Sequence, residues 1–206
     1  TVKLCELLSK NVPRSLSNTY LTNSGTEAIE AAMKLAKRIT GRTKIVAAKN
    51  GYHGNTQGAM SIMGFEERKR ACRPLLPNID FIEFNNPNDI IKIDNQTAAV
   101  FLETIQGGAG FITPIDNYLK KVKEKCDEVN ALLILDEIQP GIGRTGKLFS
   151  YEHYNIIPDI LVFGKGLGGG FPIGALSSSK ERMELFKKNP ILGHITTFGG
   201  HPVIAA

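Results

Sequence analysis

A lone lysine stands in a glycine-rich turn directly after an apolar run. Lys165 follows Gly164 and precedes the sequence Gly-Leu-Gly-Gly-Gly. A lysine that only faces solvent needs no such neighbours. A nucleophilic lysine does, because it needs room for a planar ligand and surroundings that lower its pKa. The pattern therefore makes Lys165 a candidate nucleophile.

Acidic residues end another apolar run. The segment Leu132-Leu-Ile-Leu135 is followed by Asp136-Glu-Ile-Gln139. From the residues alone, Asp136 could be a metal ligand, a helix cap or the partner of a buried cation. The four histidines and three cysteines show no HExxH or CxxC spacing, so no metal site is predicted.

Two segments could bind phosphate. In Ser24-Gly25-Thr26-Glu27, Ser24 and Glu27 have the spacing of a capping box, and the free N–H groups of a helix start form an anion site that Gly25 leaves open. The segment Gly141–Lys147 matches the GxxxxGK pattern of a nucleotide-binding loop. Leu148 follows it, however, where such a loop needs Ser or Thr to bind magnesium. A nucleotide-binding module is therefore the weaker alternative.

The elements that position these residues alternate between strand and helix. Apolar runs such as Ala99–Leu102 and Leu132–Leu135 are typical of strands buried on both faces of a parallel sheet. Helices are expected at about 2–11, 26–39, 56–63, 115–129 and 180–188, and strands near 18–22, 44–48, 79–84, 98–103, 131–136, 160–164 and 174–178. In the helix at 115–129, the apolar face is expected to consist of Ile115, Leu119, Val122, Cys126 and Val129. The rhythm predicts one domain with an α/β layered fold.

The polar segments all follow strands. In a parallel sheet the carboxyl ends of the strands share one edge, where ligands bind. The turn at Ser24, the acids Glu103 and Asp136, and Lys165 should therefore meet there.

Composition gives little support for several other classes of protein. The net charge of +5 is modest, and basic residues alternate with acids, as in the run 120–125, so a solvated helix face is favoured over nucleic-acid binding. No apolar run approaches the roughly 18 residues of a membrane span. The widely spaced cysteines are typical of a reducing, cytoplasmic location.

The motifs together resemble one family over almost the whole chain. It comprises the class III aminotransferases of pyridoxal-phosphate (PLP) fold type I, which include acetylornithine, ornithine and 4-aminobutyrate aminotransferases. The resemblance rests on Thr22-Asn-Ser-Gly-Thr-Glu-Ala28, Tyr52-His-Gly54, Glu103-Thr-Ile-Gln-Gly107, Asp136-Glu-Ile-Gln139, Gly143-Arg-Thr-Gly146, Gly164-Lys-Gly-Leu-Gly168 and Thr197-Phe-Gly-Gly200. It also accounts for the imperfect nucleotide loop, because Gly143–Gly146 belongs to the family pattern.

The resemblance implies catalytic roles for two residues and ring contacts for three others. Lys165 would carry PLP as a Schiff base and then move a proton as general acid and base. Asp136 would pair with the pyridinium nitrogen, so that the ring serves as an electron sink. Gln139 would bind the phenolic oxygen, while Tyr52 and Ile138 would cover the two ring faces.

The remaining implied roles concern the phosphate and its surroundings. The turn formed by Ser24, Gly25 and Thr26 would hold the phosphate. Thr197 would reach the phosphate of the neighbouring subunit, which implies a homodimer with shared active sites. Glu103 would support the network around the ring, and His53 would orient its loop.

Three positions depart from the family pattern. Asn55 stands where many acetylornithine and ornithine enzymes have an Arg that helps to hold a substrate carboxylate. Gly108 replaces a Glu that gates between two substrates, and His201 replaces the more usual Asn before Pro202. Losing a bidentate arginine changes carboxylate recognition. The substrate is therefore left open.

The resemblance predicts a three-layer α/β/α fold with a mostly parallel, seven-stranded sheet. Residues 1–206 would form an incomplete PLP-binding large domain, without the N-terminal segment and the C-terminal small domain of family members. The implied reaction moves an amino group from an amino acid or ω-amine to a 2-oxo acid such as 2-oxoglutarate. A PLP-dependent aminomutase or racemase of the same class is the alternative, because it shares the cofactor apparatus.

Overall fold

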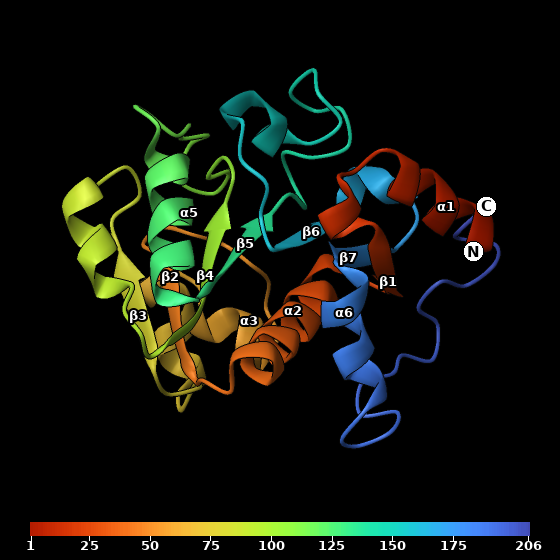
Figure 1. The fold of residues 1–206 in the computed structure, drawn as a ribbon, viewed down its shortest axis with the longest axis horizontal. Helices are drawn as coiled ribbons and strands as arrows, with labels where there is room; N and C mark the ends of the chain where they lie inside the picture. The colour runs from red at the N-terminus through yellow and green to blue at the C-terminus, as the bar shows by residue number, and fades with distance from the viewer.

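Seven strands form one sheet in the computed structural model, which describes residues 1–206. The strand order is β1-β7-β6-β5-β4-β2-β3, and in Figure 1 it runs from β3 on the left to β1 on the right. Only β7 runs antiparallel to its neighbours β1 and β6. The strands are β1 (Asn18–Thr22), β2 (Lys44–Ala48), β3 (Ile79–Ile82), β4 (Thr97–Glu103), β5 (Leu132–Asp136), β6 (Ile160–Gly164) and β7 (Gly174–Ser178).

Helices cover both faces of the sheet. The longest is α2, with 16 residues, and no helix combines the length and apolarity that crossing a membrane requires. The α-helices are α1 (Val2–Lys10), α2 (Gly25–Thr40), α3 (Gln57–Ser61), α4 (Glu66–Lys69), α5 (Tyr118–Val129) and α6 (Lys180–Met183). Short 3-10 helices connect them at Arg14–Leu16, Arg70–Cys72, Pro87–Lys92, Ser150–Tyr154, Lys165–Gly168 and Glu184–Lys187.

Two apolar cores show the three layers. Successive residues of a strand point to opposite faces, and in β4 Val100 joins the core beneath α5, whereas Phe101 joins the core beneath α2. All seven residues of β4 and all five of β5 are buried, as an apolar strand between two helix layers must be. The predicted three-layer α/β/α fold with a mostly parallel seven-stranded sheet is confirmed.

The seven expected strands are all present, each within two residues of its expected bounds. The helices differ more: α4 was not expected, and the helix expected at 180–188 is α6 followed by a 3-10 helix. The helix expected at 115–129 begins at Tyr118, because Asp116 and Asn117 adopt positive φ angles of 43° and 59°, which an α-helix does not allow. Ile115 therefore lies outside the helix and is 52% exposed, so its placement on the buried face was wrong. Tyr118 takes that place in the core.

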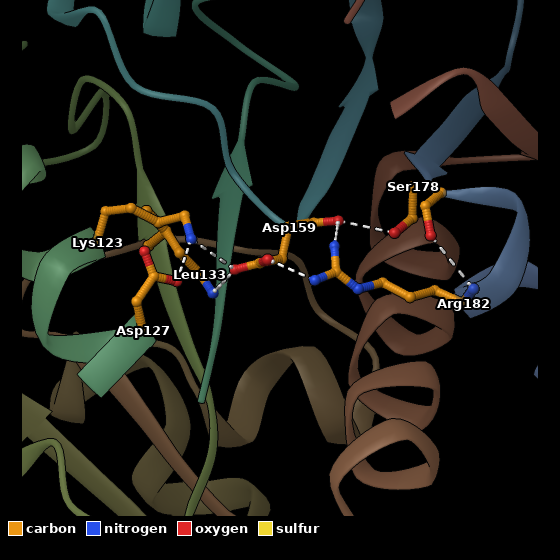
Figure 2. Close-up of polar contacts among 7 residues, drawn as sticks. Lys123, Asp127, Leu133, Asp159, Ser178 and Arg182 are labelled. Atoms are coloured by element: carbon orange, nitrogen blue, oxygen red, sulfur yellow. Dashed lines mark hydrogen bonds and ion pairs between the residues drawn. The ribbon is translucent and has the colours of Figure 1, made fainter. Parts of the chain in front are cut away.

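A polar network joins elements at the edge of the sheet where β5 and β6 begin. Figure 2 shows Asp159 at its centre. The carboxylate of Asp159 accepts the N–H of Leu133 at 2.9 Å and pairs with Arg182 Nη2 at 2.7 Å and Lys123 Nζ at 3.6 Å. The Asp159 carbonyl accepts the hydroxyl of Ser178 at 2.7 Å. One buried residue thus connects α5, β5, β7 and α6.

We expect Asp159→Ala to lower the free energy of unfolding by about 2–4 kcal/mol, because it leaves the N–H of Leu133 and two cations without their shared acceptor. Denaturant unfolding checks this. Asp127→Ala is the matched control, since Asp127 pairs with the same Lys123 but its side chain is 60% exposed, and its loss should cost less than about 1 kcal/mol. Equal effects of the two substitutions would contradict the central position of Asp159.

Candidate active site

A cavity of about 630 Å³ opens at the carboxyl ends of β1, β4, β5 and β6. It has the volume of a typical small-molecule site, roughly 300–1,000 Å³. Ten of the predicted site residues line it, namely Ser24, Gly25, Thr26, Tyr52, His53, Glu103, Asp136, Ile138, Gln139 and Lys165. The convergence expected from the strand ends is therefore present.

A buried acid and a buried imidazole meet at the end of β5. Asp136 is 3% exposed and His53 is 2% exposed. His53 Nδ1 lies 2.8 Å from Asp136 Oδ2, and the other carboxylate oxygen accepts the N–H of Ile138 at 2.9 Å. Burial alone would lower the pKa of His53, but the hydrogen bond and charge of Asp136, with the charge of Glu103, raise it above its ordinary value. The contact with Asp136 thus favours the protonated form of His53.

Glu103 fixes two loops of the cavity wall. Its carboxylate accepts the N–H of Tyr52 at 2.9 Å and the N–H of Gly107 at 3.0 Å. The pKa of Glu103 is raised above its ordinary value, mainly by burial and also by the charge of Asp136. The charge of His53 and the two backbone hydrogen bonds act in the opposite direction. Glu103 therefore acts on the cavity through the backbone that it holds.

The first turn of α2 presents an anion site. The side chain of Ser24 accepts the N–H of Glu27, as predicted, but the Glu27 carboxylate accepts the N–H of Asn23 rather than that of Ser24, so the capping box is not closed. Helix geometry leaves the N–H groups of Gly25 and Thr26 without intrahelical acceptors. These N–H groups and the positive end of a 16-residue helix suit a phosphate.

Side chains around this turn keep it in place. A Cβ on Gly25 would lie 2.7 Å from Ile138 Cδ1, so the glycine lets α2 pack closely against Ile138. On the other side, the hydroxyl of Thr26 lies 2.8 Å from that of Thr56, which donates to Glu30 at 2.6 Å. The turn is therefore fixed between β5 and the start of α3.

Lys165 stands at the end of β6 in a conformation that few lysines adopt. Its φ of 41° is in the left-handed region, and its side chain is exposed. Such a backbone is uncommon for residues other than glycine and is concentrated at functional sites. Lys165 also lines an adjoining cavity of about 310 Å³ together with Arg144. It can therefore be reached from both cavities.

Gln139 lines both cavities as well. Its amide occupies the space that a Cβ on Gly107 would need, so the two loops after β4 and β5 contact each other closely. This contact holds the Gln139 amide at the cavity that Tyr52 and Ile138 also line.

Thr197 alone of the predicted residues does not line the main cavity. It lines a neighbouring polar pocket of about 530 Å³, and Asn23 lies on the wall of both. Its predicted contact with a second subunit stays a prediction.

Sequence reasoning missed two parts of the cavity wall. Arg68 lines it from α4, and the segment Phe171–Ile173 lines it from the turn before β7. Neither belongs to a motif that follows a strand, which was the signal used. Basic residues in the run 68–73 could have drawn attention to Arg68, although nothing in the sequence separates it from its neighbours.

Glu137, next to Asp136 in sequence, stabilises the fold and does not line the cavity. It is fully buried, and its carboxylate accepts the hydroxyl of Thr104 and the N–H groups of Ser150 and Tyr151 at 2.6–2.9 Å. Burial raises its pKa to about 7. The segment Gly141–Lys147 leads into the 3-10 helix that Glu137 caps, not into the α-helix that a nucleotide-binding loop requires.

The residues around the cavity fit PLP. Its phosphate suits the α2 turn, its pyridine nitrogen needs an acid such as Asp136, and its aldehyde needs an amine such as Lys165. Tyr52 and Ile138 give the cavity apolar side chains against which an aromatic ring can pack. The donor set thus matches each polar group of the cofactor.

We expect Asp136→Asn to lower the pKa of His53, because only the charge of Glu103 then opposes the effect of burial. NMR titration of the His53 ring in the cofactor-free protein measures this, with Asp127→Asn as a remote control. The raised pKa also means that the stability contributed by protonated His53 is complete below about pH 6.5 and is lost as the pH rises through the raised value. A His53 pKa unchanged by Asp136→Asn would contradict the coupling.

Known proteins share this fold and sequence. The family model Aminotransferase class-III matches residues 1–206. The chain is 45% identical to a [LysW]-aminoadipate semialdehyde/glutamate semialdehyde transaminase of Sulfolobus acidocaldarius, covering 99% of this chain and 52% of that protein. It is 42% identical to an acetylornithine aminotransferase of Methanopyrus kandleri, covering 97% of this chain and 51% of that protein.

A solved structure agrees. The ornithine aminotransferase from Toxoplasma gondii superposes with a TM-score of 0.91 at 32% identity, over 99% of this chain and 50% of that one. The chain thus spans about half the length of the relatives that it matches. On these grounds the chain belongs to the class III aminotransferases.

Proposed function

We propose that this chain is the PLP-binding large domain of an aminotransferase, which moves an amino group from an amino acid or ω-amine to a 2-oxo acid such as 2-oxoglutarate. The observation that carries the proposal is the meeting of Lys165, Asp136 and the α2 turn around one cavity. Each of these binds a different part of PLP. The relatives named as transaminases support the same reaction class.

When bound, PLP supplies an electron-withdrawing ring that stabilises negative charge on the carbon bearing the amino group. Lys165 Nζ would hold the cofactor covalently at rest. Gly25 and Thr26 would bind the phosphate with backbone N–H groups, helped by Ser24, which caps the helix. Tyr52 and Ile138 would enclose the ring.

The chain's own acids and bases have distinct tasks. Lys165 Nζ would remove a proton from the substrate Cα and return it at the cofactor carbon C4′, acting as general base and then acid. Asp136, with one oxygen on His53 and the other on the N–H of Ile138, would keep a proton on the pyridine nitrogen. Gln139 would donate to the phenolic oxygen, and Glu103 would keep the Tyr52 loop in place.

Partners and location follow from the same proposal. A homodimer would complete each site, with Thr197 reaching the phosphate bound by the neighbouring subunit. The small-molecule partners would be an amino donor and a 2-oxo acid acceptor. The three unpaired cysteines support a reducing compartment such as the cytoplasm.

We expect Lys165→Ala to abolish covalent attachment of PLP, because no other lysine lines the cavity. Borohydride reduction followed by peptide mass spectrometry measures this in the full-length protein. Lys147→Ala is the matched control, since Lys147 also adjoins a glycine-rich segment, Gly141–Gly146, but lines neither cavity, and it should retain full labelling at Lys165. Labelling of a different lysine in the wild-type protein would overturn the assignment.

Mixed dimers can test the role of Thr197. We expect Thr197→Val to weaken PLP binding by roughly tenfold through loss of one hydrogen bond to an anion. Co-expression of Lys165→Ala subunits with Thr197→Val subunits should restore wild-type affinity at half of the sites in the mixed dimer, because one site receives both native residues. Restoration would be absent if Thr197 acted within its own subunit.

A further inference from the structure

Arg68 brings a positive charge to the cavity from outside the family motifs. It lines the cavity with Tyr52, Asn55 and Gly108. Its guanidinium lies over the ring of Phe65, 4.5 Å from the centroid. Stacking on an aromatic face leaves the N–H groups at the edge of a guanidinium free to bind a carboxylate. The guanidinium of Arg68 is therefore able to bind an anion in the cavity.

The short helix α4 that carries Arg68 is anchored from its other side. Lys69 is 4% exposed; its ammonium donates to the carbonyl of Met63 at 2.6 Å and lies 4.1 Å from the centroid of the Phe81 ring. Glu66 pairs with Arg73 at 2.6 Å. These contacts hold both ends of α4, so the placement of Arg68 does not depend on Arg68 itself.

Arg68 is the one cation of the cavity left for a substrate. Lys165 is assigned to the cofactor under the proposed function, and His53 is paired with Asp136. Arg144 lines the adjoining cavity instead. Arg68 itself makes no ion pair with a carboxylate of the chain.

The acids of the cavity are committed elsewhere. Glu103 accepts the N–H groups of Tyr52 and Gly107, and Asp136 binds His53 and the N–H of Ile138. A Cβ on Gly108 would lie 3.3 Å from Phe65 Cε2, which places position 108 directly beside the ring that supports Arg68. A glycine there leaves the guanidinium without a neighbouring carboxylate that would neutralise it.

We propose that Arg68 binds a carboxylate of the amino donor or the 2-oxo acid, and so supplies the recognition that Asn55 cannot. The proposal rests on the proposed function and narrows its substrates to carboxylates, in preference to amines and aldehydes without an acidic group. Arg68 is a specificity residue here and takes no part in proton transfer.

The test uses a ligand that cannot react. In the full-length holoenzyme, calorimetry would give the dissociation constants of glutarate and of its neutral isostere glutaramide. We expect Arg68→Gln to weaken glutarate binding by about 10- to 100-fold and to leave glutaramide binding unchanged, since a charge-assisted pair is lost only from the acid. Arg68→Lys should restore part of the affinity, because it keeps the charge but not the bidentate geometry.

Arg70→Gln is the matched control. Arg70 is an exposed arginine two residues further along and does not line the cavity, so its loss should leave glutarate binding unchanged. Equal glutarate affinity in wild type and Arg68→Gln would overturn the proposal, as would an equal loss for glutaramide.

Steady-state kinetics separates this proposal from the proposed function. If wild type transfers amino groups, Arg68→Gln should raise KM for 4-aminobutyrate or 2-oxoglutarate at little cost in kcat, and should not affect butylamine. If the wild type carries PLP on Lys165 but Arg68→Gln leaves KM unchanged, only the role of Arg68 is refuted. Absence of any PLP on Lys165 would instead refute the proposed function. The glutarate comparison, made then on the full-length protein as it is isolated, would still decide the role of Arg68.

Discussion

The buried carboxylate of Asp136 is the constraint on which the rest of the site depends. Asp136 and Glu103 stand opposite each other in the register of β4 and β5, so two acids meet on one face at the same edge. Like charges this close destabilise each other unless each has its own donors. His53 and the N–H of Ile138 satisfy one acid, while the N–H groups of Tyr52 and Gly107 satisfy the other. The loops after β2, β4 and β5 are positioned by these requirements.

One edge of the sheet stabilises the fold, and the opposite edge carries the candidate active site. At the edge where β5 and β6 begin, Asp159 joins four elements with partners supplied by the chain itself. At the opposite edge, Lys165, the α2 turn and Arg68 present donors that the chain leaves without acceptors. An unsatisfied donor is costly when it is buried but tolerable at an open cavity. The site can therefore be polar because the other edge stabilises the fold.

Prediction from sequence succeeded where one local pattern determines the structure. The strands were recognisable because burial on both faces demands apolar runs such as those in β4 and β5, and the motif residues met because parallel strands end at one edge. The pairing of His53 with Asp136 was not predicted, because it joins a loop residue to the end of a strand 83 residues away in sequence. The start of α5 was misplaced because Ile115 fits the helical period, while the positive φ of Asp116 and Asn117 interrupts it.

Arg68 was missed for a deeper reason, which bears on how such sites vary. The residues proposed to bind the cofactor lie at strand ends and at the start of a long helix. The core fixes the backbone at these positions, so local sequence patterns identify them. Arg68 lies on a four-residue helix held by Lys69 and Glu66. A helix so short has no stability of its own and depends on these tertiary contacts. A charge can therefore move between such positions, as from residue 55 to residue 68, without disturbing the sheet, because neither position contributes to the two apolar cores. Cofactor binding and substrate recognition are thus built on parts of the chain under different physical constraints, and the substrate can change while the fold and the cofactor site stay the same.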